Sequence, residues 1–145
     1  MFNVKKMTIV FLLVATSAFA AIQTGINPGW DIFGGGGSYR YGASMFGDGT
    51  NIYCYFAGPG QNGAWDYIYY WYSNNNGNTW RDQQITLQPT PGSEDALSCC
   101  DPGAFYYGGH VYIGYTSTQS TDGYRNKVYI ARSNGSVNGP WYKWN

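Results

Sequence analysis

A repeat of about sixty residues constrains the fold of this chain more than any other feature. The segment 65–80 begins with aromatic and β-branched residues and ends in a turn rich in asparagine. Segment 125–141 has the same order, and Ser73 corresponds to Ser133 at an offset of 60 (133 − 73). Apolar runs of this kind favour strands buried on both faces, and Ser, Asn and Gly favour turns. The repeat therefore predicts two copies of one strand-turn-strand unit.

The repeat continues upstream, so each copy is expected to hold four strands. Matched pairs are Gly42-Ala43 with Gly103-Ala104 and Ile52-Tyr53 with Val111-Tyr112. The expected strands are 41–46, 51–57, 66–73, 80–88, 103–107, 111–117, 124–132 and one that begins at Trp141. Four-stranded antiparallel units without helices are typical of β-propeller blades, and a ring closes with roughly four to eight of them. The sequence thus predicts an all-β propeller fragment, with blade 1 near 40–88 and a truncated blade 2 near 101–145.

The first twenty residues have the three-part pattern of a secretory signal. Lys5 and Lys6 precede the apolar run 7–15, and the small residues Ala18 and Ala20 flank Phe19 before the expected cleavage site. Cleavage before Ala21 would leave 21–145 as the propeller part. The pattern predicts a secreted, extracellular or periplasmic protein.

Composition limits the classes of partner. Charged residues make up 11% of the chain and the formal net charge is zero, which argues against binding to nucleic acid or to an anionic membrane surface. Aromatic residues make up 19%. Such rings pack well in strands, and exposed ones serve as stacking surfaces for sugars. We therefore expect a carbohydrate partner, no nucleic acid and no membrane after signal cleavage, and the oligomeric state stays open.

Three cysteines leave at least one thiol unpaired. Cys54 lies in an expected strand of the first unit, whereas Cys99 and Cys100 lead into the second. A bridge from Cys54 to one of the pair and a set of buried free thiols are both compatible with the sequence. The spacing does not fit a metal site, so we expect no metal and no cofactor, and a structural calcium ion in a full-length protein stays open.

The turn at 73–80, Ser-Asn-Asn-Asn-Gly-Asn-Thr-Trp, resembles the Asp-box of sialidase-type propellers. Asn75 stands where that box has aspartate. The Asp-box is a folding motif remote from the chemistry, so this resemblance implies architecture alone.

Segment 100–117 resembles the Asp-Pro strand, turn and Tyr-rich strand of five-bladed glycosidases, the arabinanase, levansucrase and invertase group that includes family 43. In that group the innermost strand of each blade presents the working carboxylates: an Asp base, a second Asp that orients and tunes, and a Glu acid from a later blade. Asp101, directly before Pro102, matches this pattern. Its place in the second blade implies the orienting carboxylate, and the general acid is expected beyond Asn145.

The first blade departs from the family pattern. The repeat places Arg40 where the second blade has Asp101, and Tyr39-Arg40-Tyr41 faintly resembles the Arg-Ile-Pro entry strand of sialidases. An arginine there would suit a carboxylated sugar through bidentate pairing. This departure brings the usual first-blade base into question.

Two aspartates beside tryptophans are the candidate replacements for that base. They are Asp31, next to Trp30, and Asp66, next to Trp65, with each tryptophan as a stacking surface. Glycoside cleavage needs one carboxyl group to protonate the leaving oxygen and another to activate water. The leading hypothesis is a secreted glycoside hydrolase-like propeller, inactive as this fragment alone. A non-catalytic carbohydrate-binding propeller and a sialidase-like six-bladed enzyme are the alternatives.

Overall fold

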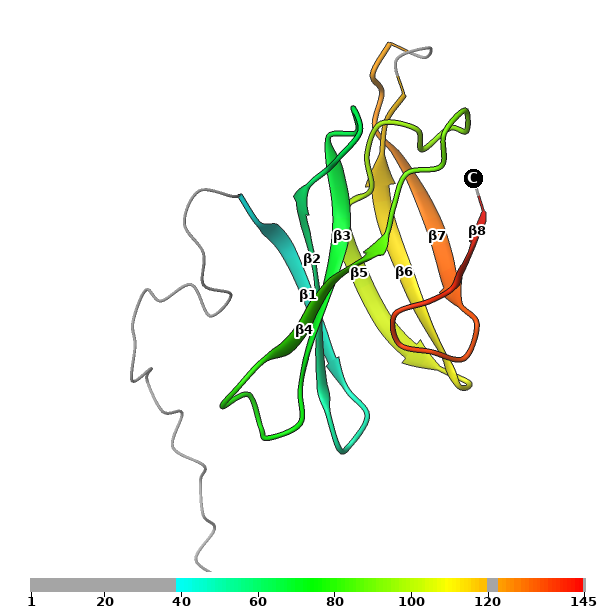
Figure 1. Cartoon of the computed structure of the whole chain (residues 1–145). Coiled ribbons are helices and arrows are strands. Elements are labelled where there is room, and N and C mark those ends of the chain that lie inside the picture. Colours follow the sequence, from blue (N-terminus) through cyan, green and yellow to red (C-terminus); the bar gives the residue numbers. More distant parts are fainter. Residues whose placement is uncertain (1–38, 120–122, 145) are drawn as a thin grey trace, which may run out of the picture. The chain divides into compact units, whose positions relative to one another are not determined.

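The computed structural model describes residues 39–119 and 123–144, and these form two antiparallel sheets of four strands each (Figure 1). The first sheet contains β1 (Tyr41–Gly47), β2 (Ile52–Pro59), β3 (Asp66–Ser73) and β4 (Arg81–Leu87). The second contains β5 (Cys100–Tyr107), β6 (His110–Ser117), β7 (Lys127–Ser133) and β8 (Trp141–Trp144). The described residues include no helix. The predicted all-β class and the two four-stranded units are confirmed, whereas the predicted signal at 1–20 lies outside the described residues.

The strands follow one another in chain order within each sheet, so β1 and β5 are edge strands. These two strands pack against each other across the two sheets. Ser44 on β1 accepts a hydrogen bond from the Ala104 backbone N–H of β5 at 2.9 Å. The indole N–H of Trp141 donates to the Thr86 hydroxyl at 3.2 Å. The sheets are therefore joined between β1 and β5, here called the inner strands, and between β4 and β8, here called the outer strands.

An apolar core lies between the sheets. From the first sheet it takes Tyr55 and Ile68, and from the second it takes Val111, Ile113 and Ala131, which are all fully buried. Strand β6 alternates between buried and half-buried residues, as expected for a strand with one face toward a core. Aromatic and β-branched residues fit this pleated surface, which explains why the aromatic-rich sequence gives strands here.

The turn after β3 is closed by side-chain hydrogen bonds. Ser73 Oγ accepts from the Gly77 N–H at 2.9 Å, and Asn75 Oδ1 accepts from the Thr79 N–H at 2.9 Å. Gly77 has φ 82, a left-handed conformation that glycine adopts without steric cost. Asn75 thus supplies the acceptor that ties the turn together, and the relation to the Asp-box stays a prediction from the sequence pattern.

All three cysteines are free thiols, so the structure favours the second of the two cysteine hypotheses. Cys54 and Cys99 are buried, and Cys100 is half-buried. Within 39–119 and 123–144 no group of His, Cys, Asp and Glu side chains could hold a metal ion. The same ranges contain no helix long and apolar enough to cross a membrane.

Candidate functional site

The sheets share one end at which β1, β3 and β5 begin, here called the entry end. At this end the backbone of β1 comes very close to the start of β5. A Cβ atom added to Gly42 would lie 3.1 Å from the Asp101 Cα and 3.5 Å from the Pro102 Cδ. Gly42 also has φ +63. A larger residue there would be strained and would push the two strands apart, so this glycine sets the spacing between the inner strands.

Asp101 is the second residue of β5, at the head of an inner strand as the sequence predicts. Its φ of 48 lies in the left-handed region, within an irregular register between Cys100 and Gly103. The carboxylate is exposed and accepts a hydrogen bond from the Thr116 hydroxyl of β6 at 2.6 Å. The bulge turns this side chain out of the regular alternation of the strand, and Thr116 fixes its direction.

Asp66 is the first residue of β3 and is only 9% exposed. Its backbone carbonyl accepts from the Cys99 N–H at 3.0 Å, which ties it to the segment that leads into β5. Its carboxylate interacts with the Tyr41 hydroxyl. Burial, then the charge of Cys100 and the interaction with Asp66, raises the pKa of Tyr41 well above its usual range. Burial and the charge of Asp66 likewise raise the pKa of Tyr39.

The structure therefore places Asp66 and Asp101 at the same end of the sheets, near the start of β1. Tyr41, the first residue of β1, interacts with Asp66 and with Cys100. Its neighbour Gly42 lies close to Asp101. The sequence predicts no role at this site for Tyr41, Cys100 or Thr116. No local pattern marks them, because their contacts join residues far apart in the chain.

Arg40 directly precedes β1 and is half-buried. Its charge acts on the hydroxyl of Tyr69 in β3, where it opposes the rise in pKa that burial causes. The Tyr69 hydroxyl itself donates to the Pro59 carbonyl at 2.6 Å. Arg40 thus interacts with the first sheet, and a role in binding a carboxylated sugar stays a prediction.

Trp65 lies directly before Asp66 and is 48% exposed. Its ring stacks on Tyr124 with centroids 5.6 Å apart and planes 13° from parallel. Tyr124 lies between β6 and β7, and the sequence analysis assigned it to a strand instead. The other two predicted site residues, Trp30 and Asp31, lie outside the described residues.

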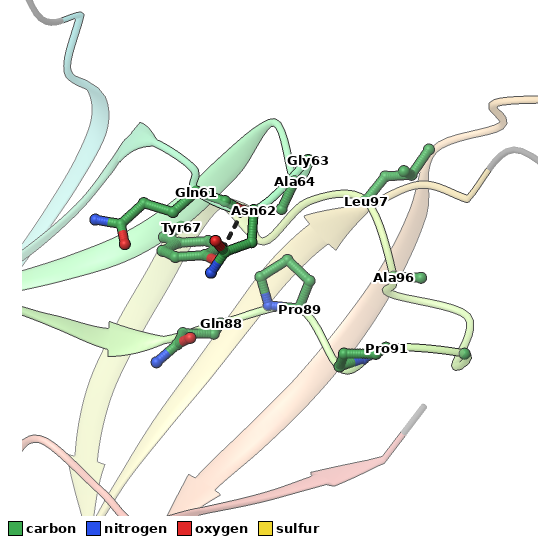
Figure 2. Close-up of a pocket in the computed structure, with 11 residues that line it drawn as sticks. Gln61, Asn62, Gly63, Ala64, Tyr67, Gln88, Pro89, Pro91, Ala96 and Leu97 are labelled. Atoms are coloured by element: carbon green, nitrogen blue, oxygen red, sulfur yellow. Dashed lines mark hydrogen bonds between the residues drawn. The ribbon is translucent and has the colours of Figure 1, made fainter.

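A pocket of about 440 Å³ opens beside this region, between the β2–β3 loop and the connection from β4 to β5 (Figure 2). Figure 2 shows the Tyr67 ring in it, with the hydroxyl bonded to the Gln61 carbonyl at 3.0 Å. The lining residues are Gln61, Asn62, Gly63, Ala64, Tyr67, Gln88, Pro89, Pro91, Gly92, Ala96 and Leu97. None of them is charged, so the lining offers no carboxylate or histidine for acid–base chemistry. The candidate carboxylates lie elsewhere at the entry end.

No protein-family profile matches the chain, and no curated protein matches it either. Solved structures do resemble it. Zg3597, a family 117 glycoside hydrolase produced by the marine bacterium Zobellia galactanivorans, is 17% identical with a TM-score of 0.60, over 74% of this chain and 38% of that one. A thermostable family-43 glycoside hydrolase is 21% identical with a TM-score of 0.61, over 79% and 39%.

A third structure, described as a glycoside hydrolase, is 15% identical with a TM-score of 0.55, over 74% of this chain and 36% of that one. The chain spans about two fifths of the length of these proteins. At identities this low, the structural similarity is evidence for the fold alone. The two sheets therefore form part of a β-propeller of the kind found in family 43 and family 117 glycoside hydrolases.

Proposed function

We propose that this chain is the amino-terminal part of a secreted propeller that cleaves glycosidic bonds in a polysaccharide or glycan. The observation that carries the proposal is the placement of Asp66, the first residue of β3, and Asp101, the second residue of β5, at the same end of the two sheets. Glycoside cleavage needs two carboxyl groups that converge on one bond. The resemblance in fold to glycoside hydrolases adds support.

The two aspartates have different surroundings and so suit different roles. Asp101 is exposed and held by Thr116, as befits a carboxylate that orients the substrate or a partner carboxyl group. Asp66 is buried beside Tyr41 and is the candidate replacement for the first-blade base. Glu94, the only glutamate of the chain, is bonded to Lys127 at 3.1 Å and to Tyr129 at 2.7 Å. Glu94 is thus engaged with β7, and the general acid is expected from another part of the protein.

One observation favours a second candidate, a propeller that binds carbohydrate without cleaving it. Asp66 is almost fully buried and interacts with Tyr41, so its carboxylate has a structural partner. In that case Arg40 and the exposed aromatic rings would carry the binding. The sialidase-like alternative rests on Arg40 and would require a carboxylated sugar.

The test is the activity of the full-length protein on arabinan, xylan, fructan and sialylated glycans. Asp101→Asn should lower turnover about 100-fold, the size of loss that misplacement of reacting groups can cause, and should leave polysaccharide binding intact. Asp48→Asn, in the β1–β2 turn far from the entry end, is the matched control and should retain activity. Unchanged turnover in Asp101→Asn would favour the binding protein. Absence of sugar release by the wild-type protein from every substrate would count against the hydrolase.

Export of the protein has its own test. Amino-terminal sequencing of the mature protein from the medium or periplasm should begin at Ala21, because the small residues at 18 and 20 fit the cleavage site. A mature protein that retains Met1 inside the cell would contradict this part of the proposal.

A further inference from the structure

Two exposed aromatic rings from different sheets meet at the entry end, and they are here called the aromatic platform. Trp65 comes from the β2–β3 loop of the first sheet, and Tyr124 comes from the β6–β7 loop of the second. The rings are 48% and 56% exposed although they stack on each other with planes only 13° apart. Such exposure leaves apolar ring surface available to a ligand.

The backbone of Trp65 is held on both sides. Its N–H donates to the Leu97 carbonyl at 2.6 Å, and its carbonyl accepts from the Gly60 N–H at 2.8 Å and from the Tyr39 hydroxyl at 2.9 Å. These bonds join three separate segments of the chain at one residue. A ring on so firmly fixed a backbone loses little freedom when it binds a ligand.

Tyr124 has φ 60, in the left-handed region. Bulky residues adopt this conformation rarely, and the strain persists only where the surroundings impose it. Glycine would remove the strain, so the backbone conformation does not favour tyrosine at this position. Burial of the ring adds little stability either, because the residue is 56% exposed. Strain of this kind clusters at ligand-binding sites.

The position and chemistry of the platform point to one class of ligand. Trp65 directly precedes Asp66, so the platform lies next to the candidate carboxylates. Tyr and Trp rings have an apolar face and a polar tip, which suit a ligand with both C–H faces and hydroxyl groups. The neighbouring pocket, which includes Ala64 and Leu97 on its wall, has an uncharged lining rich in amides and prolines. These features favour a neutral ligand over an anion or a metal ion.

We propose that Trp65 and Tyr124 form a sugar-stacking subsite that binds a neutral polysaccharide chain beside the carboxylates. This inference rests on the proposed function and makes it more specific: the protein would recognise a polymer rather than a single sugar. The platform binds sugar units of the chain outside the bond that is cleaved. Its contribution is therefore to polymer affinity and not to the chemical step.

The test compares Trp65→Ala and Tyr124→Gly with the wild-type full-length protein. Binding is measured by affinity electrophoresis in gels that contain arabinan or xylan, and activity is measured on the same polymers and on short aryl glycosides. Each variant should lose retardation in the gel, and KM for the polymer should rise about tenfold or more, as for other central aromatic contacts. KM for the short aryl glycoside should rise much less than KM for the polymer.

Tyr124→Gly separates ligand binding from folding. Because glycine suits φ 60, its thermal midpoint should equal or exceed that of the wild-type protein while polymer binding falls. Trp65→Tyr should retain binding, because it keeps an aromatic face. Tyr106→Ala, which removes an exposed ring near the other end of β5, is the matched control and should bind the polymer normally.

The outcomes distinguish the platform from the proposed function. Cleavage of a polymer with equal KM in the wild-type protein and both platform variants would overturn the platform and leave the hydrolase standing. Polymer binding that depends on both rings, without any cleavage, would support the platform and refute the hydrolase. A wild-type protein that neither binds nor cleaves any neutral polymer would refute the platform, and absence of sugar release from sialylated glycans as well would refute both.

Discussion

Lys143→Met should destabilise the protein, because Lys143 links the outermost strand of the second sheet to the connection between the sheets. Its ammonium lies 2.5 Å from the carboxylate of Asp95, and the side chains are 13% and 0% exposed. It also donates to the Gln88 carbonyl and, at 3.0 Å, to the Thr90 hydroxyl. Asp95 accepts further hydrogen bonds from the Thr90 N–H at 2.8 Å, the Ser93 hydroxyl at 2.6 Å and the Tyr115 hydroxyl at 2.9 Å.

The expected loss of stability follows from the buried Asp95 carboxylate, which the substitution leaves without its cation. Removal of one partner of a buried ion pair typically costs about 3–5 kcal/mol, since the other charge stays buried without compensation. Four other donors to Asp95 remain, the Cys99 thiol at 3.7 Å among them. We therefore expect a loss of about 3 kcal/mol in the free energy of unfolding, at the lower end of that range. A surface pair would contribute about 1 kcal/mol or less.

The loss should also depend on pH. Burial acts to raise the pKa of Asp95, but hydrogen bonds from Lys143, Ser93 and Thr90 outweigh it and hold the pKa below its usual value. The ionised carboxylate therefore stabilises the wild-type protein above the unfolded pKa of about 3.9, and this contribution is lost as pH falls through the lower folded pKa. Without Lys143 burial should dominate and raise the pKa. The variant then gains relative stability as Asp95 becomes protonated, so its deficit should shrink from pH 7 to pH 5.

Urea denaturation of the full-length protein, followed by tryptophan fluorescence at both pH values, measures this difference. Lys127→Met is the control, because Lys127 pairs with Glu94 at 3.1 Å where the side chains are 36% and 52% exposed. Equal losses in the two variants, or a loss for Lys143→Met that is the same at pH 7 and pH 5, would refute the reasoning.

Two further predictions concern the turn after β3 and the buried thiols. Asn75→Ala should lower the free energy of unfolding by about 1 kcal/mol or more, because the Thr79 N–H loses its acceptor. Asn75→Asp should keep that hydrogen bond. Equal thermal midpoints for the two variants would contradict this prediction. Burial raises the pKa of Cys54 to about 11 and raises that of Cys99 further. Both thiols should therefore resist iodoacetamide at pH 8 until the protein unfolds. Rapid labelling of either thiol in the native protein, detected by mass spectrometry, would contradict their burial.

The strands were predictable where the signal is local. Strand β3 has the predicted bounds, since an aromatic run followed by Ser, Asn and Gly specifies both the strand and its end. Strand β7 begins at Lys127 and not at 124, because Tyr124 has a left-handed backbone that cannot continue a strand. Strand β5 begins at Cys100, three residues earlier than predicted, since a bulge carries the pairing past Pro102. The pattern of residue types does not reveal either irregularity.

The candidate site was predictable only in part. The motif at 101–102 located one carboxylate at the head of an inner strand, and the structure agrees with that position. The partners of Asp66 were not predictable, because Tyr41 and Cys99 reach it from positions 25 (66 − 41) and 33 (99 − 66) residues away. Contacts over such separations depend on how the sheets pack, and a single sequence carries no local signal for them.

The repeat and the burial of equivalent residues together explain why activity should be sought in a longer protein. Ile68 and Val128 occupy matching positions in the two sheets, yet Ile68 is 0% exposed and Val128 is 76% exposed. Tyr70 and Ile130, two residues further along, show the same contrast at 4% and 50%. In the first sheet this face is covered by the second sheet, whereas in the second sheet the same face is uncovered among the described residues. An apolar face of this kind needs a covering partner, and the repeat indicates its shape: a third four-stranded unit packed as the second is packed on the first.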